Sequence, residues 1–228
     1  MEISSMKYST LILIFTLLFV GKTMANNDNK LNIHQDYTEI TQLIMKWGYY
    51  RDQGHWEKLS NTFHPEGTIA VTWYSGPFSG FVAASKKMTT ADSGIKSKHS
   101  IDTPIIEVSS NKAVSVANVR ILLRSPTAGL DLISYARFHD LLEKRDGEWK
   151  VVKRVAIYEK DRFDSILPSF GFWLKSLFMN FDNYDPAYQH IALLLEKAGL
   201  KLHEGIVVDF SPEAEQQYEE EKQWLTNQ

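Results

Sequence analysis

The sequence contains no cysteine. This absence excludes disulfide bonds, thiolate metal sites and a cysteine nucleophile. Basic residues are not in excess either, because 25 Lys and Arg stand against 28 Asp and Glu and give a formal net charge of −3. No basic stripe or cluster of Lys and Arg stands out along the chain, so we expect no nucleic acid partner.

Motifs that hold cofactors are missing as well. The sequence has no Gly-rich phosphate loop, serine nucleophile elbow or kinase-like motif. Its seven histidines include no HxH or HxxxH pair, and the closest two, His55 and His64, are nine positions apart. We therefore predict neither a cofactor nor a metal, although three histidines brought together in space would form a site that spacing does not reveal.

Only one long apolar run is present, Leu11–Val20, with the sequence LILIFTLLFV. It is shorter than the stretch of about 20 apolar residues that crosses a bilayer. Lys7 precedes the run, and Thr23-Met24-Ala25 follows it with small residues at the first and third positions. This arrangement is typical of a secretory signal peptide, so we predict that residues 1–25 are removed. The alternative is an N-terminal anchor that stays on the protein.

Export follows from that prediction, and the mature chain would have no stable insertion in a membrane. An exported protein without disulfides is more typical of a bacterial periplasm than of a eukaryotic extracellular fluid. We therefore expect a periplasmic or secreted protein. Aromatic residues make up 12% of the chain and include six Trp, a composition suited to a cavity lined with rings.

Hydrophobic periodicity divides the chain into helices and strands. Apolar residues at steps of three and four predict a helix from Asn32 to about Gly54, and a second, short helix at residues 55–63. His64–Gly67 is expected to be a turn before a strand at 68–74, and residues 75–80 a loop before a helix at 81–91. Alternation then predicts strands within 97–108 and at 113–124, 130–144 and 148–160, with Asp146-Gly147 as a hairpin turn.

Long strands preceded by helices predict an α+β fold, in which a curved antiparallel or mixed sheet forms a cone around N-terminal helices. We assign this domain to residues 26–160. Residues 161–228 are rich in aromatic side chains and carry two predicted helices, 186–198 and 212–225. We interpret them as a helical extension packed on the sheet or on a second subunit, which covers the core or closes a pocket as a lid.

The order of elements and several local motifs resemble the SnoaL-like branch of the nuclear-transport-factor-2-like superfamily. The similarity covers residues 34–160, and the motifs that carry it are YRDQGHW at 50–56, FHPEG at 63–67, KHSI at 98–101 and KRDGEWKV at 144–151. The resemblance implies the cone-shaped fold and a homodimer that pairs through its sheets. The superfamily contains dehydratases, isomerases, polyketide cyclases and non-enzymes, so the fold alone does not imply one function.

Within this superfamily, scytalone dehydratase offers the nearest chemical comparison, because an Asp at the end of its first helix and a His opening a strand orient a catalytic water. Asp52 and His99 match that pair by position, and Arg124 falls where that enzyme has a second histidine. The enzyme's other four polar positions are occupied here by Arg51, Val71, Ala136 and Phe138. Only the Asp–His pair carries over.

The resemblance therefore implies an acid–base pair, with His99 as general acid and base and Asp52 fixing its ring. The alternative is that Asp52 caps its helix and His99 is a satisfied, half-buried histidine. Arg124 is expected to bind a carboxylate or enolate oxygen if its face of the strand points inward, and to be an exposed charge otherwise. We expect the walls of the pocket among the aromatic residues Trp47, Tyr50, Trp73, Tyr74 and Phe138.

Together these residues predict a cofactor-independent lyase or isomerase, of the dehydratase or cyclase kind, that acts on a small hydrophobic carbonyl compound. Two alternatives belong to other classes of protein. One is a non-catalytic protein that holds an apolar ligand in the same pocket, and the other is a structural dimer module whose pocket is vestigial.

Overall fold

The computed structural model describes residues 32–90, 96–126, 129–166, 174 and 178–227. It divides into two compact units, Met1–Glu39 and Ile40–Gln228. Residues 32–39, the described part of the first unit, are helical. The second unit holds the sheet and every helix from α2 onward. The predicted signal peptide, residues 1–25, lies outside the described residues.

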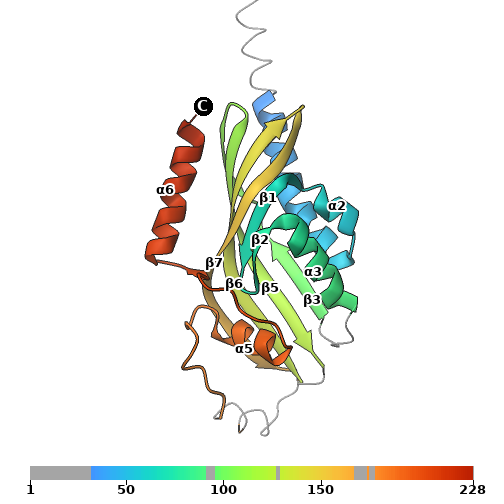
Figure 1. The fold of residues 1–228 in the computed structure, drawn as a ribbon, viewed down its shortest axis with the longest axis vertical. Coiled ribbons are helices and arrows are strands. Elements are labelled where there is room, and N and C mark those ends of the chain that lie inside the picture. The colour runs from blue at the N-terminus through green and yellow to red at the C-terminus, as the bar shows by residue number, and fades with distance from the viewer. Residues whose placement is uncertain (1–31, 91–95, 127–128, 167–173, 175–177, 228) are drawn as a thin grey trace, which may run out of the picture. The chain divides into compact units, whose positions relative to one another are not determined.

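An eight-stranded sheet forms the centre of the second unit (Figure 1). Its strands run in the order β2-β1-β7-β6-β5-β3, while β4 also pairs with β5 and β8 with β7. Neighbours are antiparallel except β1–β7 and β7–β8, which are parallel. The strands are β1 Phe63–Val71, β2 Tyr74–Pro77, β3 Lys96–Ile101, β4 Ile105–Ser109, β5 Lys112–Ser125, β6 Leu130–Arg145, β7 Glu148–Ser165 and β8 Val207–Val208.

Helices lie on both sides of the long strands. Residues 40–53 are helical and are followed by α2 Trp56–Ser60, α3 Phe78–Thr90, α5 Gln189–Lys197 and α6 Pro212–Thr226. Figure 1 shows α2 and α3 on one side of β5, β6 and β7, and α6 on the other. The predicted α+β fold with a curved sheet is confirmed, as is the end of the first helix near Gly54. None of the helices in the described ranges combines the length and the apolar character that a bilayer span requires.

Alternation along β6 defines an inner and an outer face of the sheet. Leu132, Ala136 and Phe138 are almost fully buried in the main hydrophobic core. Arg137, between two of them, points to the other face and pairs with Asp209. Strand residues two apart share a face, so we call the face of Phe138 the inner face and that of Arg137 the outer face.

The turn between β6 and β7 is the predicted Asp146-Gly147 hairpin. Both residues have positive φ, 52° for Asp146 and 82° for Gly147, as a two-residue type I′ turn requires. Arg145 and Glu148 pair directly across it. The prediction of this turn is confirmed.

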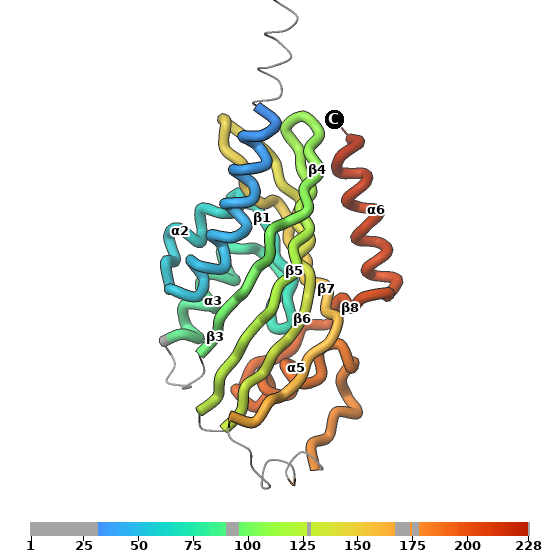
Figure 2. Tube along the Cα trace, turned by 180° about the vertical axis from the view of Figure 1, so that it is seen from behind, coloured from blue at the N-terminus to red at the C-terminus, as the bar shows by residue number. Residues whose placement is uncertain are grey.

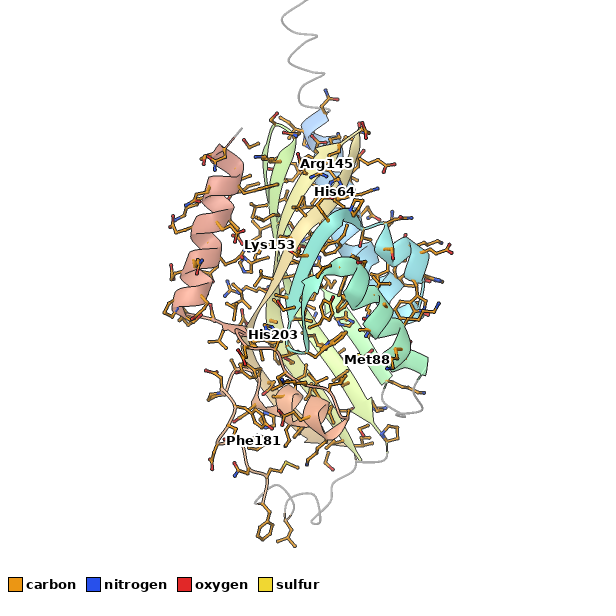
Figure 3. The ribbon with its side chains drawn as sticks, viewed as in Figure 1. His64, Met88, Arg145, Lys153, Phe181 and His203 are labelled. Atoms are coloured by element: carbon orange, nitrogen blue, oxygen red, sulfur yellow. The ribbon has the colours of Figure 1, made fainter. Side chains whose placement is uncertain are left out.

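β1 begins earlier than predicted, because His64–Gly67 is part of the strand rather than a turn before it. From Phe63 to Thr68 the chain advances five residues while its partner β7 advances two. The extra residues form a bulge in the strand. His64 Nε2 hydrogen-bonds the backbone oxygen of Glu143 at 3.0 Å and helps to fix this bulge (Figure 3).

Two further segments differ from the prediction. The expected loop at 75–80 contains β2 and the first residues of α3, and the hydroxyl of Tyr74 donates to the Pro77 oxygen at 2.8 Å across it. The single strand expected within 97–108 is two strands, β3 and β4, which both pair with β5. Pro104 lies in the break between them, where a residue without an N–H group leaves no ladder bond unmade.

Beyond residue 160, the described helices α5 and α6 pack on opposite faces of the sheet (Figure 2). β7 continues past its predicted end at 160 to Ser165. The two predicted helices correspond to α5, which contributes Ile191 to the main core, and to α6. Ala214 of α6 packs with Val155 and Ile157 on the outer face. The described part of the extension packs on the sheet, and its packing on a second subunit stays a prediction.

Candidate functional site

Asp52 and His99 meet between the first helix and β3. His99 Nδ1 lies 2.7 Å from Asp52 Oδ1, and the His99 backbone N–H donates to Asp52 Oδ2 at the same distance. Both side chains are largely buried, with exposed fractions of 12% for His99 and 9% for Asp52. A carboxylate only accepts hydrogen bonds, so Nδ1 carries the hydrogen in this contact. The other ring nitrogen, Nε2, is then the atom that faces any further group.

Gly48 lets the helix pass close to β3. A Cβ atom at this position would lie 2.9 Å from Ile101 Cδ1 and 3.5 Å from the Cβ of His99. The first distance is too short for a real side chain unless Ile101 moves. The absence of a side chain at Gly48 therefore helps to bring Asp52 within reach of His99.

An aromatic cluster adjoins the His99 imidazole on the inner face, through the ring of Trp47. The Trp47 ring stands edge-on to His99, with centroids 5.6 Å apart, and also contacts Phe138 at 5.4 Å. Phe81 stacks on Trp47 at 6.0 Å and joins it to Trp73 at 5.2 Å. Two of the predicted walls, Trp47 and Phe138, thus lie in one cluster with His99, and Trp73 reaches that cluster through Phe81.

The other two predicted walls lie further from His99. Tyr74 contacts Phe81 and Trp73, at 5.9 and 5.8 Å, and so belongs to the outer part of the same cluster. Tyr50 has its ring contacts with Tyr49 and His55, each at 6.1 Å. The structure therefore places Tyr50 apart from the rings around His99.

Arg124 does not face His99, so of its two expected roles the structure has the exposed charge. His99 pairs with Ile121 across the β3–β5 ladder, whereas Arg124 pairs with Lys96, three positions away. An odd offset along a strand puts two side chains on opposite faces. Arg124 is 56% exposed and makes a bidentate pair with Asp131, at 2.7 and 2.6 Å, which raises the pKa of Arg124.

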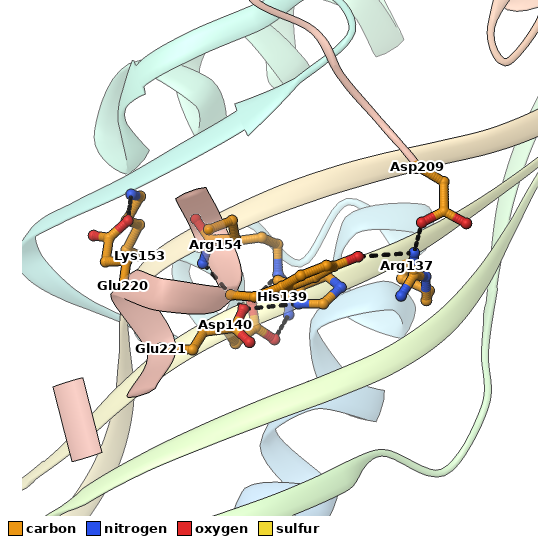
Figure 4. Close-up of polar contacts among 10 residues, drawn as sticks. Arg137, His139, Asp140, Lys153, Arg154, Asp209, Glu220 and Glu221 are labelled. Atoms are coloured by element: carbon orange, nitrogen blue, oxygen red, sulfur yellow. Dashed lines mark hydrogen bonds and ion pairs between the residues drawn. The ribbon is translucent and has the colours of Figure 1, made fainter. Parts of the chain in front are cut away.

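Arg154 of β7 is the inner-face cation that the sequence did not reveal. Its guanidinium is fully buried, and Nε and Nη2 donate to the two oxygens of Asp140 at 2.6 and 2.7 Å (Figure 4). Its central carbon lies 4.4 Å from the Trp47 ring centroid and 4.3 Å from that of Phe138. Arg154 therefore shares one aromatic neighbour, Trp47, with His99. No signal in the sequence marked Arg154, because positions 154 to 158 are all buried and the face of Arg154 follows from the pairing of β7 with β6.

Several buried donors near this cluster have no partner among the described residues. They include Nε1 of Trp47, Nη1 of Arg154 and Nη1 of Arg51. Most buried polar groups in proteins are hydrogen-bonded, so each exception calls for an explanation. Trp47 carries its donor on the ring that contacts His99, and Arg154 lies against the same ring, so these donors are candidates to bind an oxygen-bearing ligand.

Tyr158 adds a neutral polar group on the same face of the sheet. It is 1% exposed, and its hydroxyl oxygen accepts from the Thr72 backbone N–H at 3.1 Å and lies 3.2 Å from Thr72 Oγ1. Burial raises the pKa of Tyr158, and the two contacts with Thr72 oppose that shift only in part. The hydroxyl is therefore protonated at neutral pH.

Within the described ranges, no group of three or more His, Asp or Glu side chains is arranged to hold a metal ion. The polar groups near His99 are instead an imidazole, two carboxylates and two guanidinium groups. This set can move protons and stabilise negative charge without a metal.

Residues 33–155, more than half of the chain, match the SnoaL-like domain. The chain belongs to the SnoaL-like family. An uncharacterized protein of Aspergillus terreus is 26% identical over 198 residues, which are 77% of this chain and 71% of that relative.

Solved structures share the SnoaL-like fold with this chain. A scytalone dehydratase-like protein of Novosphingobium aromaticivorans has a TM-score of 0.51 and 18% identity, over 63% of this chain and 95% of that one. A type 2 hexachlorocyclohexane dehydrochlorinase has a TM-score of 0.53 and 16% identity, over 61% of this chain and 96% of that one. At these identities the likeness shows the fold alone.

Proposed function

We propose that this SnoaL-like protein is a cofactor-independent lyase or isomerase, in which Asp52 and His99 form an acid–base pair that acts on a small carbonyl compound. The observation that carries the proposal is the two-point contact of Asp52 with His99, at the ring and at the backbone. A ring held at Nδ1 presents Nε2 in one orientation, which general acid–base chemistry requires.

In the proposed reaction, neutral His99 takes a proton from the carbon next to the substrate carbonyl. The C–H bond breaks, an N–H bond forms at Nε2, and the electron pair passes to the carbonyl oxygen to give an enolate. Asp52 stabilises the imidazolium that results, because the two opposite charges are only 2.7 Å apart in a largely buried place.

Arg154 replaces Arg124 as the candidate for holding the enolate oxygen. Its Nη1 is buried and has no partner among the described residues, while Asp140 fixes the rest of the guanidinium. A hydrogen-bond donor that is held in position before the reaction stabilises the transition state most where negative charge develops. The imidazolium then returns its proton, either to another carbon in an isomerisation or to a departing hydroxyl group in a dehydration.

The reaction class also agrees with the names of the solved relatives. One is named as a dehydratase and the other as a dehydrochlorinase, so both are named for eliminations. The aromatic rings of Trp47, Phe81 and Phe138 support a substrate with an apolar body.

Proton abstraction can be tested before the substrate is known. A panel of small ketones, keto acids and hydroxy ketones is incubated with the protein in deuterated water, and NMR follows the exchange of hydrogen next to the carbonyl. We expect exchange with at least one compound, and its loss in His99→Ala with the circular dichroism spectrum unchanged. His55→Ala is the matched control, because His55 is exposed and lies outside the cluster.

The same panel separates the enzyme from a binding protein. If compounds bind but none exchanges, and binding is equal in wild type and His99→Ala, the protein holds its ligand without chemistry. Exchange at the wild-type rate in His99→Ala would show that another group removes the proton.

We also propose that the protein is exported after removal of residues 1–25 and that it acts as a homodimer. N-terminal sequencing of the protein from its host tests the first proposal, with Asn26 as the expected first residue. Sedimentation equilibrium tests the second, and a monomer at micromolar concentration would contradict it.

A further inference from the structure

Arg51 is a buried cation without an ion-pair partner among the residues that the structure describes. It is only 6% exposed, and its Nη1 has no hydrogen-bond partner in the described part of the chain. Its aromatic neighbour is Trp56, whose ring centroid lies 5.9 Å from the guanidinium carbon. Asp52 follows it in the sequence, but both oxygens of that carboxylate bond to His99.

Each of the other arginines among the described residues has a carboxylate partner, which the described residues do not provide for Arg51. Arg154, which is also buried, has both oxygens of Asp140. Arg137 contacts Glu159 and Asp209, and Arg145 contacts Glu66 and Glu143. Burying a charge is costly unless it is paired, so a protein keeps an unpaired buried guanidinium when something else supplies the negative charge.

The pKa of Arg51 agrees with that description. Burial lowers the pKa of Arg51, and the nearby charge of Asp52 opposes the shift. An arginine paired with a carboxylate shows the opposite direction, as Arg124 and Arg145 do.

Arg51 lies next to Asp52 on the first helix and one turn from Trp47, which contacts His99. Trp47 precedes Arg51 by four residues on the same helix, and side chains four apart lie on one face. Trp47 stands against His99 and has its own unpartnered donor, Nε1. One helical turn therefore presents two unpartnered buried donors, Trp47 Nε1 and Arg51 Nη1, beside the Asp52 that orients His99.

We propose that Arg51 binds a carboxylate group of the substrate, which narrows the substrate class to small carboxylic acids that carry the reacting carbonyl. This inference rests on the proposed function, since it concerns the same site. A guanidinium matches the two oxygens of a carboxylate in one plane. Trp47 Nε1 supplies a neutral donor beside it, and the rings of Trp47 and Trp56 receive the apolar part of the molecule.

A carboxylate fits better than a phosphate for reasons of charge. The ionised groups around the site are Arg51 and Arg154 on one side and Asp52 and Asp140 on the other. Asp140 is taken by Arg154 and Asp52 by His99, so among these groups Arg51 is left to pair with the ligand, and one guanidinium balances the single charge of a carboxylate but not a dianion.

Binding of a simple carboxylate to the whole protein tests this inference without any turnover. Benzoate is the probe, and benzamide is its neutral counterpart of the same shape, with both followed by isothermal titration calorimetry. We expect benzoate to bind wild type at least about tenfold more tightly than benzamide, since a charge-assisted contact is lost in the amide. Arg51→Met should remove this preference, and Arg51→Lys should retain part of it.

Arg162→Met is the matched control, because Arg162 is 60% exposed and pairs with Asp164. It should bind benzoate as wild type does. His99→Ala should also retain benzoate binding, so loss of exchange in that variant and loss of binding in Arg51→Met are independent results. If wild type catalyses proton exchange but does not prefer benzoate to benzamide, the carboxylate site is overturned and the proposed function is not.

A measurement on wild type guards against a variant that does not fold. Two-dimensional ¹⁵N–¹H NMR detects arginine guanidinium groups, and benzoate should shift the Arg51 signal while benzamide leaves it in place. Equal binding of both probes, or an unmoved Arg51 signal at saturating benzoate, would overturn the inference.

Discussion

Asp52 contacts His99 at two points, the ring Nδ1 and the backbone N–H, and both distances are 2.7 Å. One carboxylate thus fixes the orientation of the imidazole and also ties the first helix to β3. The two contacts have different consequences for substitution. The backbone contact needs only an acceptor, whereas stabilisation of an imidazolium needs a negative charge.

Asp52→Asn should therefore separate chemistry from structure. The amide oxygen can still accept from the His99 backbone N–H, but the charge is gone. We expect the proton-exchange rate to fall by about a hundredfold to ten-thousandfold, the range that acid–base catalysis contributes, with little change in melting temperature. Asp102→Asn is the control, since Asp102 is 49% exposed and pairs with Arg120. A parallel loss in both variants would point to a general effect on the fold.

Asp140→Asn should destabilise the protein strongly. Asp140 and Arg154 are both fully buried, so the substitution leaves a buried guanidinium without its counter-charge. We expect a loss of about 3–5 kcal/mol in the free energy of unfolding, measured by urea denaturation. Asp131→Asn, which breaks the exposed pair with Arg124, should have a much smaller effect. The double variant Asp140→Leu with Arg154→Met should recover much of the stability, because it removes both charges.

Tyr158 should make the protein sensitive to alkali. Burial raises the pKa of Tyr158, so the folded state holds this proton more tightly than the unfolded chain does. The resulting stability is complete below the unfolded pKa of about 10 and is lost as the pH rises through the folded pKa. We expect the free energy of unfolding to fall as the pH rises above about 10, and to fall less steeply in Tyr158→Phe. Tyr49→Phe is the control, because Tyr49 is 58% exposed, and an equal change in both would contradict the assignment.

Glu221→Ala should loosen α6 from the outer face of the sheet. Glu221 lies 2.7 Å from Nδ1 of His139, which is 2% exposed, and also accepts from Gln217 (Figure 4). Leaving that buried ring without its partner should cost about 1–3 kcal/mol. Hydrogen exchange should show faster exchange of the α6 amides while β6 stays protected. In Glu219→Ala, which changes an exposed residue of the same helix, exchange in α6 should stay as in wild type.

Local patterns predicted the parts of the fold that depend on neighbouring residues. The Asp146-Gly147 hairpin was predictable, because positive φ at two successive positions favours this pair of residues. The starts of β6 and β7 followed from alternation, and α6 begins at Pro212 after the Ser211 cap. Asp52 and His99 came from the family resemblance, since nothing in the local sequence brings positions 47 residues apart together.

The faces of the long strands could not be predicted in the same way. Each bulge changes which residues share a face, and the ladder between β6 and β7 shifts register twice, at Tyr135/Ala136 and at Leu141/Leu142. The inward position of Arg154 and its pairing with Asp140 depend on that register. The outward position of Arg124 likewise depends on where β3 pairs with β5. The pairing of strands far apart in the sequence decides which side chains face inward, and neither composition nor the spacing of residues predicts that pairing.

Gly48 makes the separation of the acid and the base adjustable from outside the pair. The backbone at this residue passes so near Ile101 and His99 that the spacing between helix and strand is set there by van der Waals contact. A methyl group added at position 48 would force the Ile101 side chain to move, two residues along β3 from His99, with every titratable group still in place. Under the proposed function, such a substitution would change turnover at a residue that has no chemistry of its own.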